Sequence, residues 1–338
     1  MEATTKSNDV FSIVFLVLLA VLLSNVCRAQ SNTNADNKNS TQQNANDAAR
    51  MDSIMRQKLI TTSPKLGGVT VSNTVSSIKA DGHRFTVQMP TVDFSLPLYK
   101  NFKTAHPVLI KAGVRYQGLI LSDERKIGSN DFHSVSIPVI ANYSLSRATN
   151  IGFIGSVTVA SDFKQDLEGQ DILYNIGFRI GLRQNKKFKY GITPTYSKSY
   201  SGTFLLPILD MDWTISKRLS LLAILPVRAS LKYKLSEVHS IGATAWLGGN
   251  NMYRLSEPEK EQYIHLRQNN AGLIYDARLG QRWKLNLVAG YTLMQKLETF
   301  NTDQKISLNR FNELNKRVVN VAYHEKSFIV QSSISYQF

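Results

Sequence analysis

Apolar and polar residues alternate along most of this chain. Between Val135 and Leu145 the odd positions are apolar, whereas Ser136, Asn142 and Ser144 occupy even positions. A period of two is typical of a β-strand with one apolar face. Similar stretches of about ten residues, separated by polar turns, recur from Val69 to the end of the chain. The pattern predicts an all-β fold made of many antiparallel strands.

Strand length and aromatic placement favour a membrane barrel over a soluble β-sandwich, the main alternative. Many stretches approach the roughly 9–11 residues of a tilted membrane strand, whereas strands of soluble sheets average about 5–6. The polar faces mix charges of both signs with Gly and Ser, which suits a hydrated lumen. Aromatic residues lie where strands meet short turns, as in an interfacial girdle: Phe188, Tyr190, Trp213, Trp283, Tyr336 and Phe338.

The last strand carries the most specific pattern. In Ser327–Phe338, Phe328, Val330, Ile334, Tyr336 and Phe338 share one face, and the chain ends on an aromatic residue. This resembles the closing strand of bacterial outer-membrane β-barrels, which the barrel-assembly machinery reads. The resemblance covers roughly residues 85–338 and is to uncharacterised barrel families of Gram-negative envelopes. It implies an antiparallel transmembrane β-barrel, with Ile334, Tyr336 and Phe338 as the assembly signal and that machinery as a partner.

The strand count depends on one stretch of the chain. Alternation from Phe85 onward gives about 12 strands, but the short turns near Gln184 and Arg282 then fall at opposite rims, which such barrels avoid. A break at Leu225-Pro226 restores one rim of short turns, and proline cannot donate to a strand ladder. With residues 69–78 as a first strand the count becomes about 14, an even number. Both counts stay open, and 12 is slightly favoured because the split halves would be short.

Residues 1–29 are predicted to be a signal peptide. The apolar run Val10–Leu23 is too short to span a membrane as a helix, and Cys27-Arg28-Ala29 offers small residues for cleavage before Gln30. An uncleaved anchor and a lipoprotein at Cys27 are alternatives, the second disfavoured by the bulk of Val26. Cleavage after Ala29 would remove the only cysteine, leaving no disulfide or thiol chemistry.

Residues 30–68 are predicted to be a disordered periplasmic segment ahead of a barrel at 69–338. Residues 30–50 contain almost no large apolar side chain and cannot offset the entropy of ordering. Met51, Ile54, Met55 and Leu59 share one helical face, so residues 48–59 could form a short helix. A helix of that length is marginal on its own.

Charge points to anionic partners other than nucleic acid. The formal net charge is +15, and export argues against a nucleic-acid partner. Outer-membrane lipid headgroups, lipopolysaccharide phosphates or an anionic solute in the lumen are the partners expected of a basic barrel.

Charged residues on the polar parity are the candidate lumen residues. They could line a pore or pocket that prefers anions, or they could hold a closed lumen together through ion pairs. Both interpretations stay open. The residues are Lys111, Arg115, Arg179, Arg183, Asp210, Asp212, Arg228, Lys232, Lys234, Asp276 and Arg278.

No catalytic, metal or cofactor motif stands out, and no cofactor is predicted. The six histidines are scattered without metal-ligand spacing. His133-Ser134 and His239-Ser240 suggest a hydrolase, but neighbours on a strand point to opposite faces, so neither pair can join nucleophile to base. The chain is therefore interpreted as a non-enzyme, with an outer-membrane lipid-modifying or hydrolytic enzyme as the alternative.

The sequence thus predicts a porin-like narrow channel or a structural envelope component in the outer membrane of a Gram-negative bacterium. With the C-terminus at the periplasmic rim, Gly249–Gln268 and Glu298–Lys326 are expected to be long external loops. Each contains a stretch that could be helical, Glu257–Arg267 and Arg310–Val319 respectively.

Overall fold

The computed structural model describes residues 67–80, 82–104, 106–146, 148–256, 261–308, 313 and 316–338. The predicted signal peptide, disordered segment and 48–59 helix lie outside these residues. Among the described residues no helix is long and apolar enough to cross a membrane.

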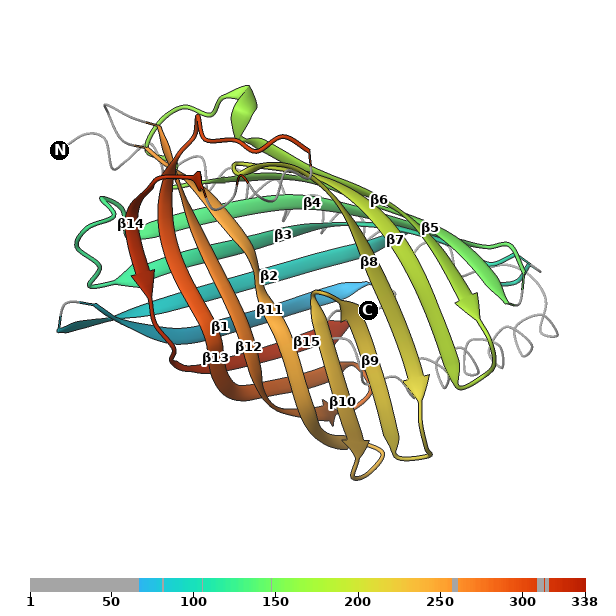
Figure 1. Ribbon diagram of the computed structural model, residues 1–338. Helices are drawn as coiled ribbons and strands as arrows, with labels where there is room; N and C mark the ends of the chain where they lie inside the picture. Colours follow the sequence, from blue (N-terminus) through green and yellow to red (C-terminus); the bar gives the residue numbers. More distant parts are fainter. Residues whose placement is uncertain are drawn as a thin grey trace, which may run out of the picture. The chain divides into compact units, whose positions relative to one another are not determined.

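The described chain forms one antiparallel sheet that closes on itself (Figure 1). Each strand pairs with the next from β1 to β13, and β15 closes the wall between β13 and β1. The strands are β1 (Gly68–Ala80), β2 (His83–Asn101), β3 (Val108–Ser122), β4 (Asp131–Ser144), β5 (Thr149–Ser161), β6 (Ile172–Arg183), β7 (Phe188–Ser199), β8 (Gly202–Thr214), β9 (Leu219–Leu225), β10 (Arg228–Lys234), β11 (His239–Leu255), β12 (Gln262–Leu279), β13 (Trp283–Asn301), β14 (Val319–His324) and β15 (Phe328–Gln337). A 3₁₀ turn, η1 (Gly169–Asp171), precedes β6.

The wall of the barrel has 14 strands, because β14 only extends the line of β15 along β13. The slightly favoured count of 12 was wrong. The stretch 219–235 breaks at Leu225-Pro226 into β9 and β10, and the predicted first strand exists as β1. The short halves are held because each pairs along both edges, β9 with β8 and β10, and β10 with β9 and β11.

One end of the barrel carries compact turns, here called the short-turn end. The turns at 184–187, 215–218, 235–238 and 280–282 lie there together with Phe338. An aromatic girdle forms at this end, with ring centroids 4.8 Å apart for Trp283–Tyr336, 6.1 Å for Phe188–Trp213 and 6.0 Å for Phe94–Phe338. Exposed apolar side chains such as Ile137, Phe178 and Val330 cover the outer face, as a lipid-facing surface requires.

At the opposite end, the loop end, three strands bend at the same height. Register shifts lie at Leu247/Asn250 between β11 and β12 and at Asn269/Asn270 between β12 and β13. Each lies about eleven residues from the short-turn end of its strand, the length that spans a membrane. Beyond the bulges, residues 250–255, 262–268 and 294–301, together with β14, form what we call the roof.

The roof packs against the inner face of β1–β5. Arg254 of β11 forms a parallel bridge with Ser161 of β5, a strand that is not its neighbour in the wall. A buried apolar core joins the two layers, from Ile78, Phe85, Val87, Leu119, Leu121 and Phe132 on the wall to Tyr253, Leu255, Ile264, Leu266, Leu297 and Tyr323 on the roof. The loop end of the barrel is therefore closed by an apolar core.

The first predicted external loop is mostly strand, and the second is strand near both of its ends. Residues 249–255 and 262–268 belong to β11 and β12, so Gly249–Gln268 is not a loop and residues 262–267 are not helical. Residues 298–301 and 319–324 belong to β13 and β14. Half of the suggested helix at 310–319 lies outside the described residues, and Val319 begins β14. Both faces of β12 and β13 are largely buried within the roof, which allows polar residues on either face and erases the alternation.

Candidate lumen chamber and roof

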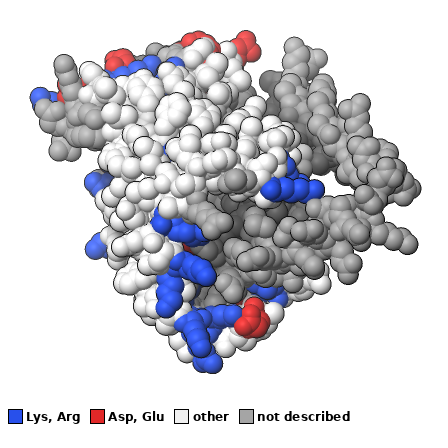
Figure 2. Space-filling view, turned by 90° about the vertical axis from the view of Figure 1, so that its right-hand side faces the viewer, with Lys and Arg blue, Asp and Glu red and all other residues white. Residues whose placement is uncertain are grey.

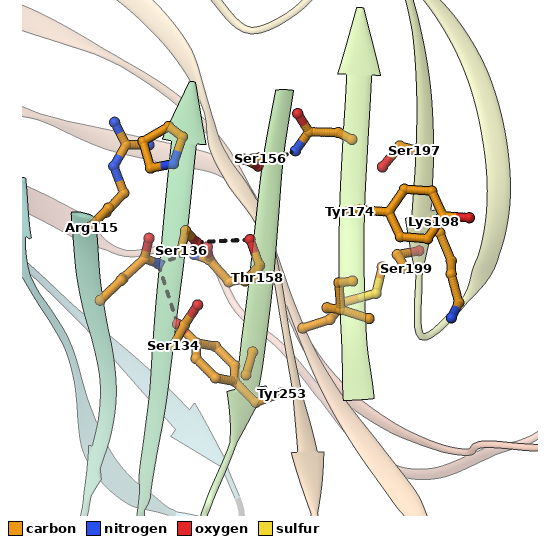
Figure 3. A pocket seen from close by; sticks show the side chains of 17 residues that line it. Arg115, Ser134, Ser136, Ser156, Thr158, Tyr174, Ser197, Lys198, Ser199 and Tyr253 are labelled. Carbon is orange, nitrogen blue, oxygen red and sulfur yellow. Dashed lines mark hydrogen bonds between the residues drawn. The ribbon is translucent and has the colours of Figure 1, made fainter. Parts of the chain in front are cut away.

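A chamber of about 380 Å³ lies inside the wall between β3–β7 and the roof. Its wall is rich in hydroxyl and amide side chains, several of which face the cavity in Figure 3. Ser136 bonds Thr158 at 2.8 Å, and the Asn175 amide donates to Ser156 at 2.8 Å. Asn251 and Tyr253 of the roof complete the lining. The chamber can therefore donate and accept hydrogen bonds toward a polar group.

Strand register explains why these side chains share the lumen. Residues directly opposite in neighbouring strands point to the same face. The inward-facing positions of one strand therefore determine which positions of the next strand face inward. Gln117 lies opposite Ser134, Ser134 opposite Ala160, and Ser136 opposite Thr158. The polar parity predicted from sequence is the parity that lines this chamber.

Three ion pairs cross the lumen face. Arg115 pairs with Asp93, its direct cross-strand neighbour, and the Arg115 Nε atom donates to Asp93 Oδ2 at 2.9 Å. Arg179 holds Asp210 bidentately at 2.8 and 2.6 Å. Lys232 contacts Asp276. Two of these three pairs lie within the predicted set; Asp93 was missed, although it interrupts the apolar run between Val92 and Phe94.

The other predicted lumen charges are spread along the wall. Lys111 lies on β3 opposite Ile140, and Arg228 lies 5.9 Å from the Trp246 ring centre. Lys234 pairs with Glu237 at 2.6 Å beside a short turn. The rest lie near the ends of their strands at the short-turn end: Arg183, Asp212 and Arg278. The structure therefore divides the set between ion pairs at mid-wall and a basic rim.

The short-turn end is strongly basic. Figure 2 shows Lys and Arg side chains gathered over the lower part of this view, where acidic side chains cover less of the surface. Exposed basic residues occupy its turns, namely Lys186, Lys187, Lys217, Arg218 and Arg282. A rim of this kind raises the local concentration of anions.

Roof and wall are locked by polar contacts at the loop end. Arg254 donates to Asp171 at 2.6 Å, and these side chains are 5% and 1% exposed. Burial lowers the pKa of Arg254, but the hydrogen bond and charge of Asp171 outweigh burial and raise it. Burial also raises the pKa of Tyr200, whose hydroxyl donates to the Ala160 carbonyl at 2.8 Å while its ring stacks on Tyr263.

A second cluster lies on the roof itself. Glu298 contacts Arg267, and its Oε1 atom accepts a hydrogen bond from His324 Nε2 at 2.8 Å. Burial raises the pKa of Glu298, but the hydrogen bonds from His324 and Arg267 outweigh burial and hold it below its usual range. This cluster ties β12, β13 and β14 together.

Residues 76–337 match the model of one protein family, the domain of unknown function DUF6268. The chain belongs to the DUF6268 family. No curated protein matches it significantly.

Solved structures similar to this DUF6268 protein include outer-membrane channels and porins. The COG4313 outer membrane channel from Pseudomonas putida F1 is 9% identical, with a TM-score of 0.38 over 81% of this chain and 97% of that chain. The Pseudomonas putida toluene transporter TodX is 9% identical, with a TM-score of 0.34 over 83% and 93%. The KdgM porin is 8% identical, with a TM-score of 0.31 over 80% and 99%. These similarities concern the fold alone, so the function of the DUF6268 protein has to be inferred from its own residues.

The two His-Ser sequences of the DUF6268 protein divide between the faces of the wall. His133 and His239 each share a 2.8 Å hydrogen bond with a tyrosine hydroxyl, of Tyr116 and Tyr275. Ser134 lines the chamber, and Ser240 lies on the lumen side near Asp276. Neither His-Ser sequence therefore forms a dyad of a serine nucleophile and a histidine base. Among the described residues no group of His, Cys, Asp and Glu could hold a metal ion.

Proposed function

We propose that this DUF6268 protein is an outer-membrane channel held closed by its roof. The observation that carries the proposal is a polar chamber sealed at one end by an apolar core and two ion-pair clusters. A barrel that served only as a scaffold would need neither a hydrated chamber nor a separate lid. The short-turn end faces the periplasm in this proposal, as the resemblance of β15 to closing strands implies, and the roof faces outward.

The solute class follows from charge. The basic rim at the short-turn end and the excess of Lys and Arg on the lumen face favour an anion over a cation. Hydroxyl and amide groups in the chamber would replace part of its hydration. Outer-membrane lipid and lipopolysaccharide surround the barrel in this proposal, and the barrel-assembly machinery inserts it.

Opening the roof tests the channel. Tyr253 and Leu266 are both buried in the roof core, so Tyr253→Asp with Leu266→Asp places two charges where they are costly. In planar bilayers we expect the parent protein to pass almost no current and the variant to give stepwise currents. Under a KCl gradient, the reversal potential should have the sign expected of an anion-selective pore.

The matched control is Leu308→Asp, because Leu308 is exposed near the roof. It should stay as silent as the parent protein. A heat-modifiable band on gels verifies that each barrel is assembled. An assembled, roof-opened variant without current contradicts the channel and favours a structural envelope component.

A further inference from the structure

A second cavity lies on the inner face of the wall, where β15, β1, β2 and β3 pair with one another. Its volume is about 120 Å³. We call it the seam pocket, because the pairing that closes the barrel between β1 and β15 runs through it. Every side chain that lines it is polar, and the lining residues are Thr70, Ser72, Thr91, Asp93, Arg115, Gln117, Gln331 and Ser333.

Strand register joins the seam pocket to the chamber. Direct cross-strand neighbours form one row of polar residues from β15 to β4, namely Ser333, Ser72, Thr91, Gln117 and Ser134. A second row lies nearer the short-turn end and consists of Thr70, Asp93, Arg115 and Ser136. Directly opposed residues face the same side, so both rows line the lumen. Arg115 and Gln117 border both cavities, and Figure 3 shows Arg115 at the edge of the chamber.

The ion pair between Arg115 and Asp93 leaves hydrogen-bonding groups for a ligand. Arg115 uses its Nε and Nη2 atoms on a single carboxylate oxygen, Asp93 Oδ2. Among the described residues, neither Arg115 Nη1 nor Asp93 Oδ1 has a hydrogen-bond partner. The Arg115 side chain is 48% exposed. Its Nη1–Nη2 edge can therefore take a carboxylate, whose geometry a guanidinium matches bidentately.

Two further acceptors of the seam pocket are unpaired. Ser333 is 5% exposed, and its Oγ atom has no hydrogen-bond partner within the described part of the chain. The same holds for the buried Oε1 atom of Gln331 in the same strand. Buried polar groups are normally hydrogen-bonded, and an unpaired one is costly. The pocket is thus suited to a ligand that brings hydrogen-bond donors as well as negative charge.

We propose that the seam pocket and the chamber together bind a hydroxylated carboxylate. Its carboxylate accepts from the Nη1–Nη2 edge of Arg115, its adjacent hydroxyl donates to Asp93 Oδ1 or Ser333 Oγ, and its remaining hydroxyl groups lie among the Ser and Thr side chains of the chamber. The seam pocket has the volume of about four water molecules in the liquid, which suits a carboxylate with one adjoining hydroxyl-bearing carbon. The inference rests on the proposed function, because it names the class of anion that the channel takes.

The same groups disfavour simpler ligands. A plain carboxylate would leave Asp93 Oδ1 and Gln331 Oε1 unpaired and close to its own negative charge. A neutral polyol would leave the guanidinium edge without a charged acceptor, and charge-assisted hydrogen bonds are roughly twice as strong as neutral ones. A cation would meet the charge of Arg115. Only a ligand with both groups satisfies the pocket.

Calorimetry with ligands of equal carbon number tests this site. Gluconate carries a carboxylate and hydroxyl groups, glucitol carries hydroxyl groups alone, and hexanoate carries a carboxylate alone. With the assembled full-length protein in detergent micelles at constant ionic strength, gluconate should bind at least about tenfold more tightly than glucitol or hexanoate. Absence of gluconate binding, or an equal affinity for either of the other ligands, overturns the proposal.

Ser333→Ala with a neighbouring control locates the ligand. Because Ser333 Oγ has no internal partner, this substitution breaks no hydrogen bond of the folded protein, and it should weaken gluconate binding about fivefold. Ser332→Ala is the matched control, because Ser332 is exposed and the adjacent residue of a strand points to the opposite face. The control should bind gluconate as the parent protein does. Equal affinities in the two variants contradict the seam pocket.

Neutralising the ion pair tests the role of charge. Arg115→Gln with Asp93→Asn removes both charges together, so that neither is left without its partner. Gluconate binding should weaken at least about tenfold and approach that of glucitol, whose own affinity should change little. An unchanged gluconate affinity overturns the role of Arg115.

Loss of this site and loss of the channel are distinguishable. A roof-opened barrel that carries chloride current while the parent protein fails to bind gluconate sinks the site alone. Gluconate binding by a barrel that never conducts supports the site and sinks the channel alone.

Discussion

At the scale of single residues, ion pairs link elements that are distant in the sequence. Arg179 and Asp210 meet across Gly191, where an added Cβ would lie 2.6 Å from Asp210 Oδ1 and 2.8 Å from Arg179 Nη2. The small residue makes room for the pair. At the loop end, Arg254 and Asp171 are almost fully buried. Without Asp171, the buried Arg254 would keep only longer contacts to the partly exposed Glu261 at 3.6 Å and Glu168 at 3.9 Å, and breaking a buried pair is costly.

Asp171→Ala should therefore lower the free energy of roof opening by about 3–5 kcal/mol. Hydrogen exchange of the β12 amides at residues 262–268 measures this quantity. Replacing both partners, Asp171→Leu with Arg254→Met, should recover much of the loss because no charge is left buried. Equal losses in the single and double variants would show that the pair does not hold the roof.

The cluster at Glu298 predicts a pH dependence. Its pKa is lowered in the folded protein, so its stabilisation is present above the unfolded value of about 4.3 and is lost as the pH falls through the lower folded value. The urea midpoint of the parent protein should be flat between about pH 7 and 5 and fall below about pH 4. Glu298→Gln should be less stable at pH 7 and should show a smaller drop. Parallel curves would place the acid sensitivity elsewhere.

At the scale of elements, the wall could be predicted from sequence but the roof could not. Wall strands have one lipid face and one polar face, so alternation marks them, and Pro226 marks the break between β9 and β10. In the roof, β12 is buried on both faces, so polar residues such as Gln262, His265 and Gln268 lie among apolar ones. The lumen parity was predictable for the same reason as the wall, whereas the chamber depends on the roof.

The roof part of β11 begins at its bulge, where Gly248 packs closely against β12. A Cβ at Gly248 would lie 2.7 Å from Gln268 Cβ and 2.6 Å from its Oε1, and Gln268 is buried with a bond to Ser76 at 3.1 Å. Gly248→Ala should weaken the roof by about 1–3 kcal/mol and speed exchange of the β12 amides. Gly169→Ala is the control, since nothing lies within 4 Å of its added Cβ. Equal exchange in both variants would show that the close packing at Gly248 does not stabilise the roof.

At the scale of the whole molecule, the barrel joins two unlike ends through one wall. The short-turn end is basic and ringed by aromatic residues, and the loop end is closed by an apolar core. Phe338 belongs to the girdle through edge contacts with Phe94 and Tyr336, and its amide donates to the Gly67 carbonyl at 3.3 Å. The last residue therefore joins the two ends of the wall.

Deletion of Phe338 should reduce assembly into the membrane and leave export intact. The fraction of heat-modifiable protein in the membrane, compared with total exported protein, measures this. Phe338→Tyr keeps a ring at this position and should assemble as the parent protein does. An unchanged assembled fraction after the deletion would remove Phe338 from the assembly signal.

The seam between β1 and β15 joins the most distant parts of the barrel chain, as the 2.9 Å hydrogen bond between Thr70 and Ser335 spans 265 positions. Contacts of such sequence separation carry a large loop-closure cost and form late in folding. Until the final strand arrives, β1 and the growing sheet both present open edges that can recruit foreign strands. Closure of this barrel therefore waits for β15, and a chain truncated anywhere before β15 has two open strand edges instead of a seam.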